Sequence, residues 1–101
     1  MKVQTKSEIL SFLTKSRPQL DGFGVRKIGL FGSFIRNQQT ENSDIDILVD
    51  FHPDKKKYDN FIDLAFYIED NLERSVDLVT LDSLSPFIGP HILKEVEYLA
   101  F

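Results

Sequence analysis

Two short segments carry residue types suited to phosphate and metal chemistry. Gly32-Ser33 follows an apolar run, and Asp44-Ile45-Asp46 comes ten residues later. A Gly-Ser pair between a strand and a helix lets backbone N–H groups and a hydroxyl approach phosphate oxygens, and the helix start adds a favourable dipole. Two aspartates two residues apart on a strand project from one face, roughly 6.5–7 Å apart at their Cα atoms. Mg²⁺ takes few carboxylates and completes its shell with phosphate and water, so the spacing predicts metal-dependent phosphoryl or nucleotidyl transfer.

A third acidic residue, Asp77, interrupts the apolar run Val76-Asp77-Leu78-Val79. Burying a lone carboxylate is costly unless it is paired or metal-bound, so its position is an argument for function. It would then serve as a further metal ligand or as general base for an attacking hydroxyl. The competing interpretation is a partly exposed position on an edge strand. Asp50 continues the Asp46 face, but we expect it to be structural because it lies too far along the strand.

The elements that must position these residues are predicted by hydrophobic periodicity and capping signals. A Thr5–Glu8 capping box opens the first helix, and Pro18 is expected to end it before a turn over residues 19–24. Alternation is clearest in residues 44–51, where Ile45, Ile47 and Val49 share a face. The expected elements are helix 5–16, strand 25–31, a helix opening at 34–36, loop 37–43, strand 44–51, helix 58–74, strand 76–81 and helix 90–100. This order predicts an α/β or α+β fold with a small mixed sheet of three to four strands flanked by helices.

Composition narrows the classes of function. The chain has 101 residues, 42% hydrophobic and 28% charged, which is typical of one globular domain. It has no cysteine, which excludes thiol catalysis and zinc–thiolate sites. The formal net charge of −4 disfavours direct nucleic-acid binding, which uses basic surfaces. No apolar run is long enough for a membrane span and no signal-peptide core follows the N-terminus, so we expect a cytoplasmic protein with no membrane partner.

The pattern Gly32-Ser33-x10-Asp44-x-Asp46, followed by Asp77 in a further strand, resembles the nucleotidyltransferase superfamily of DNA polymerase β type. The short chain, the run of residues 43–49 and the closing Ile92-Leu93-Lys94-Glu95 segment resemble its minimal nucleotidyltransferase (MNT) branch. The resemblance covers about residues 25–99. It implies the polymerase-β-like nucleotidyltransferase fold, with residues 1–101 as a single minimal nucleotidyltransferase domain.

The resemblance also implies roles for individual residues. Gly32 and Ser33 would hold the nucleotide phosphates, and Arg36 matches an arginine that the family often has after Gly-Ser. The catalytic and metal-binding residues would be Asp44, Asp46 and Asp77, holding one or two Mg²⁺ ions with ATP as substrate. One departure is Asn37, which stands where the family often has glycine and leaves the turn geometry open.

The resemblance finally implies a partner. MNT proteins are antitoxins of HEPN-domain RNase toxins, and members transfer AMP from ATP to a tyrosine of the toxin. Two alternatives remain: an antitoxin that neutralises its toxin by binding alone, and a nucleotidyltransferase subunit that modifies a small molecule. The absence of a large helical domain disfavours the second for an isolated chain. The sequence leaves open the oligomeric state, including a homo-oligomer.

Overall fold

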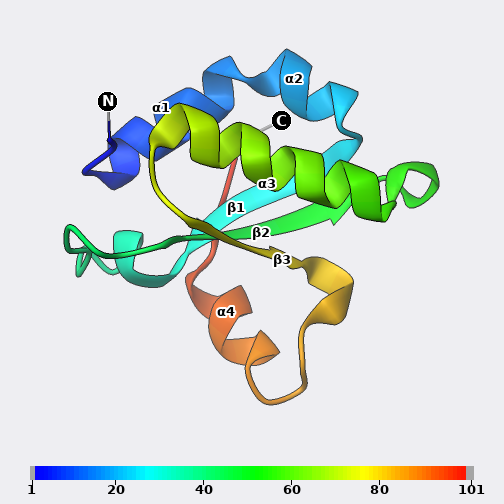
Figure 1. The fold of residues 1–101 in the computed structure, drawn as a ribbon. Coiled ribbons are helices and arrows are strands. Elements are labelled where there is room, and N and C mark those ends of the chain that lie inside the picture. The colour runs from blue at the N-terminus through cyan, green and yellow to red at the C-terminus, as the bar shows by residue number, and fades with distance from the viewer. Residues whose placement is uncertain (1, 100–101) are drawn as a thin grey trace.

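A mixed four-stranded sheet lies at the centre of the computed structural model, which describes residues 2–99 (Figure 1). The strand order is β3-β2-β1-β4. β1 (Val25–Phe31) and β2 (Ile45–Phe51) are antiparallel, β3 (Val76–Thr80) runs parallel to β2, and β4 (Glu97–Tyr98) is antiparallel to β1. The prediction of a small mixed sheet flanked by helices is confirmed.

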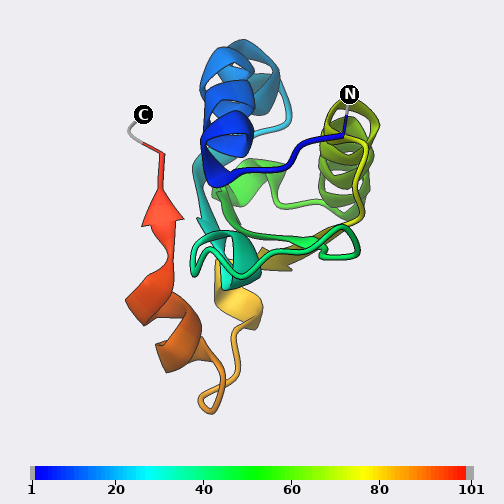
Figure 2. The ribbon, with the colours of Figure 1, turned by 90° about the vertical axis from the view of Figure 1, so that its left-hand side faces the viewer.

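Helices cover the two faces of the sheet unequally. Three helices pack on one face: α1 (Lys6–Lys15), α2 (Arg17–Gly22) and α3 (Tyr58–Leu72). Among residues 2–99, one short α-helix, α4 (Gly89–Glu95), lies on the opposite side, as the turned view shows (Figure 2). One face is therefore a closed core, and the other is only partly covered.

The alternation of side chains along β2, predicted from the sequence, determines which residues face each side of the sheet. Its buried residues Ile45, Ile47, Val49 and Phe51 face the three helices, where they meet Ile9, Leu13, Leu20, Leu64, Ile68 and Leu72. Fully burying each such side chain contributes roughly 1.5–3 kcal/mol. The intervening Leu48 packs on the other face with Phe31 and Ile92 of α4. Asp46 shares that second face, so it lies in the partly covered layer.

The N-terminal helices differ from the prediction at one point. The Thr5–Glu8 capping box is confirmed, with the Glu8 N–H donating to Thr5 Oγ1 at 3.2 Å. The expected turn over residues 19–24 is wrong, because α2 spans Arg17–Gly22 with Pro18 in its first turn. Proline is tolerated there since the first N–H groups of a helix have no intrahelical acceptor. Pro18 therefore begins a second helix rather than ending the first.

The C-terminal segment also departs from expectation. The predicted helix 90–100 is wrong over its second half, because α4 ends at Glu95 and β4 pairs with Gly29 and Leu30 of β1. A Cβ at Gly29 would lie only 2.7 Å from Val96 Cγ2, so glycine permits this close approach. Residues 100–101 lie outside the described residues. Over residues 2–99, no helix is long and apolar enough to cross a membrane.

Candidate active site

Three neighbouring strands bring the predicted site residues into one row. Phe31, the last residue of β1, is the register partner of Asp46 on β2, and Gly32 follows it directly. Asp46 is in turn the parallel register partner of Asp77 on β3. Adjacent strands lie about 4.8 Å apart, so Asp46 is a direct neighbour of Asp77, and Gly32 lies one residue beyond the position paired with Asp46. The sheet topology thus assembles residues separated by up to 45 positions in the sequence.

Gly32 is required by geometry as well as by conformation. Its φ of +78° lies in the left-handed region that L side chains rarely adopt. A Cβ at this position would lie 2.1 Å from Asp46 Oδ2, well inside van der Waals contact. The Asp46 carboxylate therefore sits directly against the bare backbone of Gly32.

The segment after Gly32 is a tight turn rather than the expected α-helix. Gly32–Phe34 forms one 3₁₀ turn (η1), and the N–H groups of Ile35 and Arg36 both donate to the Gly32 carbonyl at 3.1 Å. The predicted helix at residues 34–36, with its dipole, is therefore wrong. Asn37 has φ 57°, a left-handed conformation that asparagine tolerates better than most non-glycine residues. This explains how the turn closes without glycine at that position.

Asp46 lies in an electrostatically unfavourable environment for a carboxylate. Burial raises its pKa to about 6 from the ordinary 3.8, and the negative charges of Asp77, Asp44 and Glu95 add to the shift. The Arg36 guanidinium partly offsets it. Desolvation and like charges both disfavour the ionised form. The three predicted aspartates therefore interact, with Asp46 at their centre.

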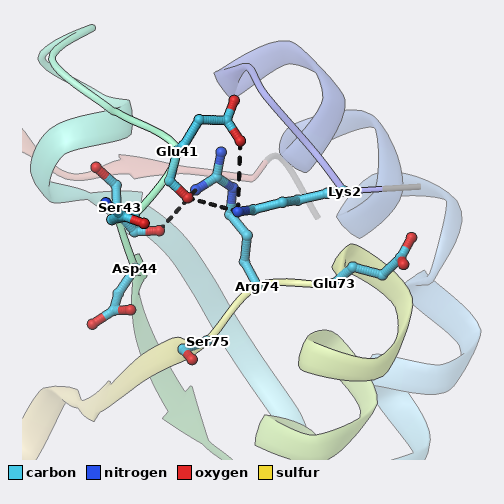
Figure 3. Close-up of a pocket in the computed structure, with 8 residues that line it drawn as sticks. Lys2, Glu41, Ser43, Asp44, Glu73, Arg74 and Ser75 are labelled. Atoms are coloured by element: carbon cyan, nitrogen blue, oxygen red, sulfur yellow. Dashed lines mark hydrogen bonds and ion pairs between the residues drawn. The ribbon is translucent and has the colours of Figure 1, made fainter.

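Asp44 lies immediately before β2 and is exposed, at the end of a loop that a buried arginine holds in place. Arg74 is 6% exposed. Its Nη1 donates to the carbonyls of Thr40, Glu41 and Ser43 at 3.0, 3.3 and 2.9 Å, and its Nε donates to the Val3 carbonyl at 2.7 Å. Figure 3 shows Arg74 reaching this loop across a polar pocket of about 270 Å³, whose wall includes Asp44. Arg74 thus fixes the backbone directly before Asp44.

Asp77 is not buried, so the expectation that the cost of burial argues for its function is wrong. β3 is an edge strand and Asp77 is exposed, so there is no buried lone carboxylate. The pairing of Asp77 with Asp46 in the sheet register, rather than burial, supports a role for Asp77 in the candidate site. Asp77 also borders a cleft of about 350 Å³ whose other lining residues are mainly apolar: Phe31, Val79, Ser83, Leu84, Ser85, Ile88 and Ile92.

Asp50 is structural as predicted, since it accepts a hydrogen bond from Arg26 Nε at 3.0 Å.

A fourth carboxylate, from Glu95 at the end of α4, reaches the Gly-Ser turn. Its Oε2 accepts a 2.7 Å hydrogen bond from the Gly32 N–H. Arg36 Nη1 donates to both Glu95 oxygens, at 2.8 and 3.0 Å. Glu95 was not among the predicted site residues, because the helix predicted over residues 90–100 placed it in the middle of the helix and not at its end. Ser33, half-buried in the 3₁₀ turn, is brought to the same place.

The donor set fits a divalent cation completed by ligands from outside the chain. Within residues 2–99, no three acidic or histidine side chains already converge as a metal cage. Mg²⁺ is usually held by one or two carboxylates together with phosphate oxygens and water, so a ready-made cage is not required. A bound cation would offset the like charges that raise the pKa of Asp46.

A comparison with known protein families shows the class of protein to which this chain belongs. Residues 13–100 match the family described as "Polymerase beta, Nucleotidyltransferase". The chain belongs to this nucleotidyltransferase family, as the resemblance of its motifs indicated. It is an enzyme of the nucleotidyltransferase class, and its fold is that of a minimal nucleotidyltransferase.

Three individual proteins show which members of the family this chain is similar to. The chain is 45% identical to "Protein adenylyltransferase MntA" of Thermococcus cleftensis over 98% of this chain and 100% of the relative. It is similar to a solved toxin–antitoxin complex with AMP-PNP (TM-score 0.70, 30% identity, 86% of this chain and 71% of that one). It also resembles a chain in the complex of tri-AMPylated Shewanella oneidensis HEPN toxin with MNT antitoxin (TM-score 0.66, 25% identity, covering 93% and 71%).

Proposed function

We propose that this protein is an Mg²⁺-dependent adenylyltransferase that transfers AMP from ATP to a tyrosine of a partner HEPN-domain RNase and so acts as its antitoxin. The observation that carries the proposal is the register that sets Asp46 beside Asp77 and against Gly32. It brings acidic side chains and the Gly32 backbone N–H together at one end of three adjacent strands. The protein adenylyltransferase relative supports a protein as acceptor, and the complex of an AMPylated HEPN toxin with an MNT antitoxin supports a HEPN protein as partner.

Each residue has a definite task in this proposal. The Gly32 N–H, Ser33 and Arg36 bind the phosphates of ATP, and Asp44, Asp46 and Asp77 hold Mg²⁺. When bound, Mg²⁺ neutralises the phosphate charge and polarises the reacting phosphorus. The tyrosine oxygen forms a bond to the α-phosphorus, the bond from that phosphorus to the bridging oxygen breaks, and pyrophosphate leaves. The aspartates orient the phosphates for this in-line displacement.

The acceptor hydroxyl must lose a proton during the transfer. A tyrosine has a pKa near 10, so at neutral pH it needs a base. Asp77 is exposed on the edge strand and can accept that proton from a partner's side chain. The neighbouring cleft, lined by Phe31, Val79 and Ile88, offers apolar contact to an aromatic ring.

The net charge of −4 accords with a protein partner rather than a nucleic acid. A catalytic antitoxin modifies many toxin molecules, whereas an antitoxin that acts by occlusion must match its toxin one for one. The test mixes the HEPN partner with a tenfold deficit of this protein, with and without ATP and Mg²⁺. We expect loss of RNase activity and a mass gain of AMP on a tyrosine only with both. Inhibition that needs equimolar protein and ignores ATP would refute the enzymatic account.

A further inference from the structure

The carboxylate of Glu95 occupies the groups that the proposed function assigns to the nucleotide phosphates. The Gly32 N–H and the Arg36 guanidinium converge on this one side chain, at 2.7 Å and at 2.8 and 3.0 Å. A carboxylate held by a backbone N–H and an arginine has the same donors that a phosphate oxygen would use. Glu95 therefore stands in the place of an anionic ligand.

Two electrostatic effects oppose this placement. Glu95 is the last residue of α4, where the helix dipole disfavours a negative charge. It also faces Asp46, whose pKa its charge helps to raise. The contacts to Gly32 and Arg36 hold the carboxylate there in spite of both effects. Its side chain is 25% exposed, so it can leave without rebuilding the core.

A backbone N–H can donate one good hydrogen bond, so Gly32 cannot serve Glu95 and a phosphate oxygen together. Two anions on the same donors would also repel each other. Nucleotide binding at this turn therefore requires Glu95 to move away.

We propose that Glu95 is an intramolecular competitor of the nucleotide, which keeps the phosphate-binding turn closed until ATP with its cation displaces it. This inference rests on the proposed function, because it assumes that Gly32 and Arg36 bind phosphate. The alternative role for Glu95 is to orient Arg36 toward the nucleotide, and the two roles predict opposite effects of the same substitution.

The test is a double-mutant cycle read by calorimetric binding of AMP-PNP with Mg²⁺. The proteins are wild type, Glu95→Ala, Arg36→Ala and the double variant. Glu97→Ala is the matched control, because Glu97 lies two residues further on, is exposed and pairs with Lys6 instead. Circular dichroism confirms that each variant is folded.

Competition predicts that Glu95→Ala binds AMP-PNP about fivefold tighter or more, which corresponds to about 1 kcal/mol for a released surface ion pair. Glu97→Ala should bind as wild type does. Competition also predicts that Arg36→Ala weakens binding at least about threefold more in the Glu95→Ala background, since Arg36 is then free for phosphate.

Three results would overturn the inference alone. Weaker binding by Glu95→Ala would make Glu95 a positioning residue for Arg36. If the effects of Glu95→Ala and Arg36→Ala on AMP-PNP affinity are additive, Glu95 affects binding only through its negative charge and does not compete for Arg36. Equal increases in AMP-PNP affinity from Glu95→Ala and Glu97→Ala would show that Glu95 acts only through its charge and not as a competitor. If no folded variant, wild type included, binds AMP-PNP with Mg²⁺, the proposed function fails and this inference falls with it.

Discussion

Replacing Asp46 by asparagine should stabilise the metal-free protein at neutral and alkaline pH. Asp46 has a pKa of about 6 in the folded protein against 3.8 ordinarily, so the folded state holds the proton more tightly than the unfolded chain. Its contribution to stability is complete below about pH 4 and is lost as pH rises through about 6. An asparagine carries no charge at any pH and avoids that loss.

The size of the effect follows from the pKa difference. The change from 3.8 to about 6 corresponds to about 3 kcal/mol at 1.36 kcal/mol per pH unit. Water screens a half-buried carboxylate, so we expect roughly half of this, about 1.5 kcal/mol. For a chain of this length that is a rise in Tm of roughly 6–12 °C at pH 8. The difference should shrink as pH falls and vanish near pH 4.

The assay is thermal unfolding of wild type and Asp46→Asn between pH 4 and 8 in the presence of a chelator. The matched control is Asp50→Asn, on the same strand, because Asp50 pairs with the positively charged Arg26. That control should not gain stability. A Tm for Asp46→Asn that is equal to or below that of wild type at pH 8 would refute the electrostatic account of the site.

Further perturbations test other parts of the site. Mg²⁺ should raise the Tm of wild type but not of Asp46→Asn, and its affinity, measured by calorimetry, should fall below about pH 6 because protonated Asp46 cannot ligate. Gly32→Ala should lower the free energy of unfolding by about 1–3 kcal/mol, because its φ of +78° and its contact with Asp46 both oppose a side chain; a denaturation curve unchanged from wild type would contradict this. Arg74→Lys should destabilise by about 2–3 kcal/mol in urea and weaken Mg²⁺ binding, since one ammonium cannot replace the hydrogen bonds that hold the loop before Asp44.

The parts of the fold with strong local patterns could be predicted from the sequence. Alternation fixed the two faces of β2, and the 3.6-residue period gave most of α3, which ends at Leu72 instead of residue 74. The site motif was also local enough to place Gly32 and Asp46 together, because an antiparallel pair of strands brings their positions into register.

The rest depends on non-local contacts. β4 has two residues and exists because it pairs with Gly29 and Leu30, nearly 70 positions earlier. Arg74 is the last residue of the predicted helix 58–74, and its burial depends on carbonyls from two distant segments. Glu95 could have been singled out as a carboxylate at a helix C-terminus, where it is disfavoured, had the end of α4 been predicted correctly.

The most direct test of the account is which phosphorus of ATP reaches the partner. The HEPN protein is incubated with this protein, Mg²⁺ and ATP labelled with ³²P at either the α or the γ position, and with Asp46→Asn as the inactive variant. We predict that α-label becomes covalently bound to a tyrosine of the partner, that γ-label does not, and that Asp46→Asn transfers neither. Transfer of γ-label, or α-label transfer undiminished in Asp46→Asn, would contradict adenylyl transfer at this site.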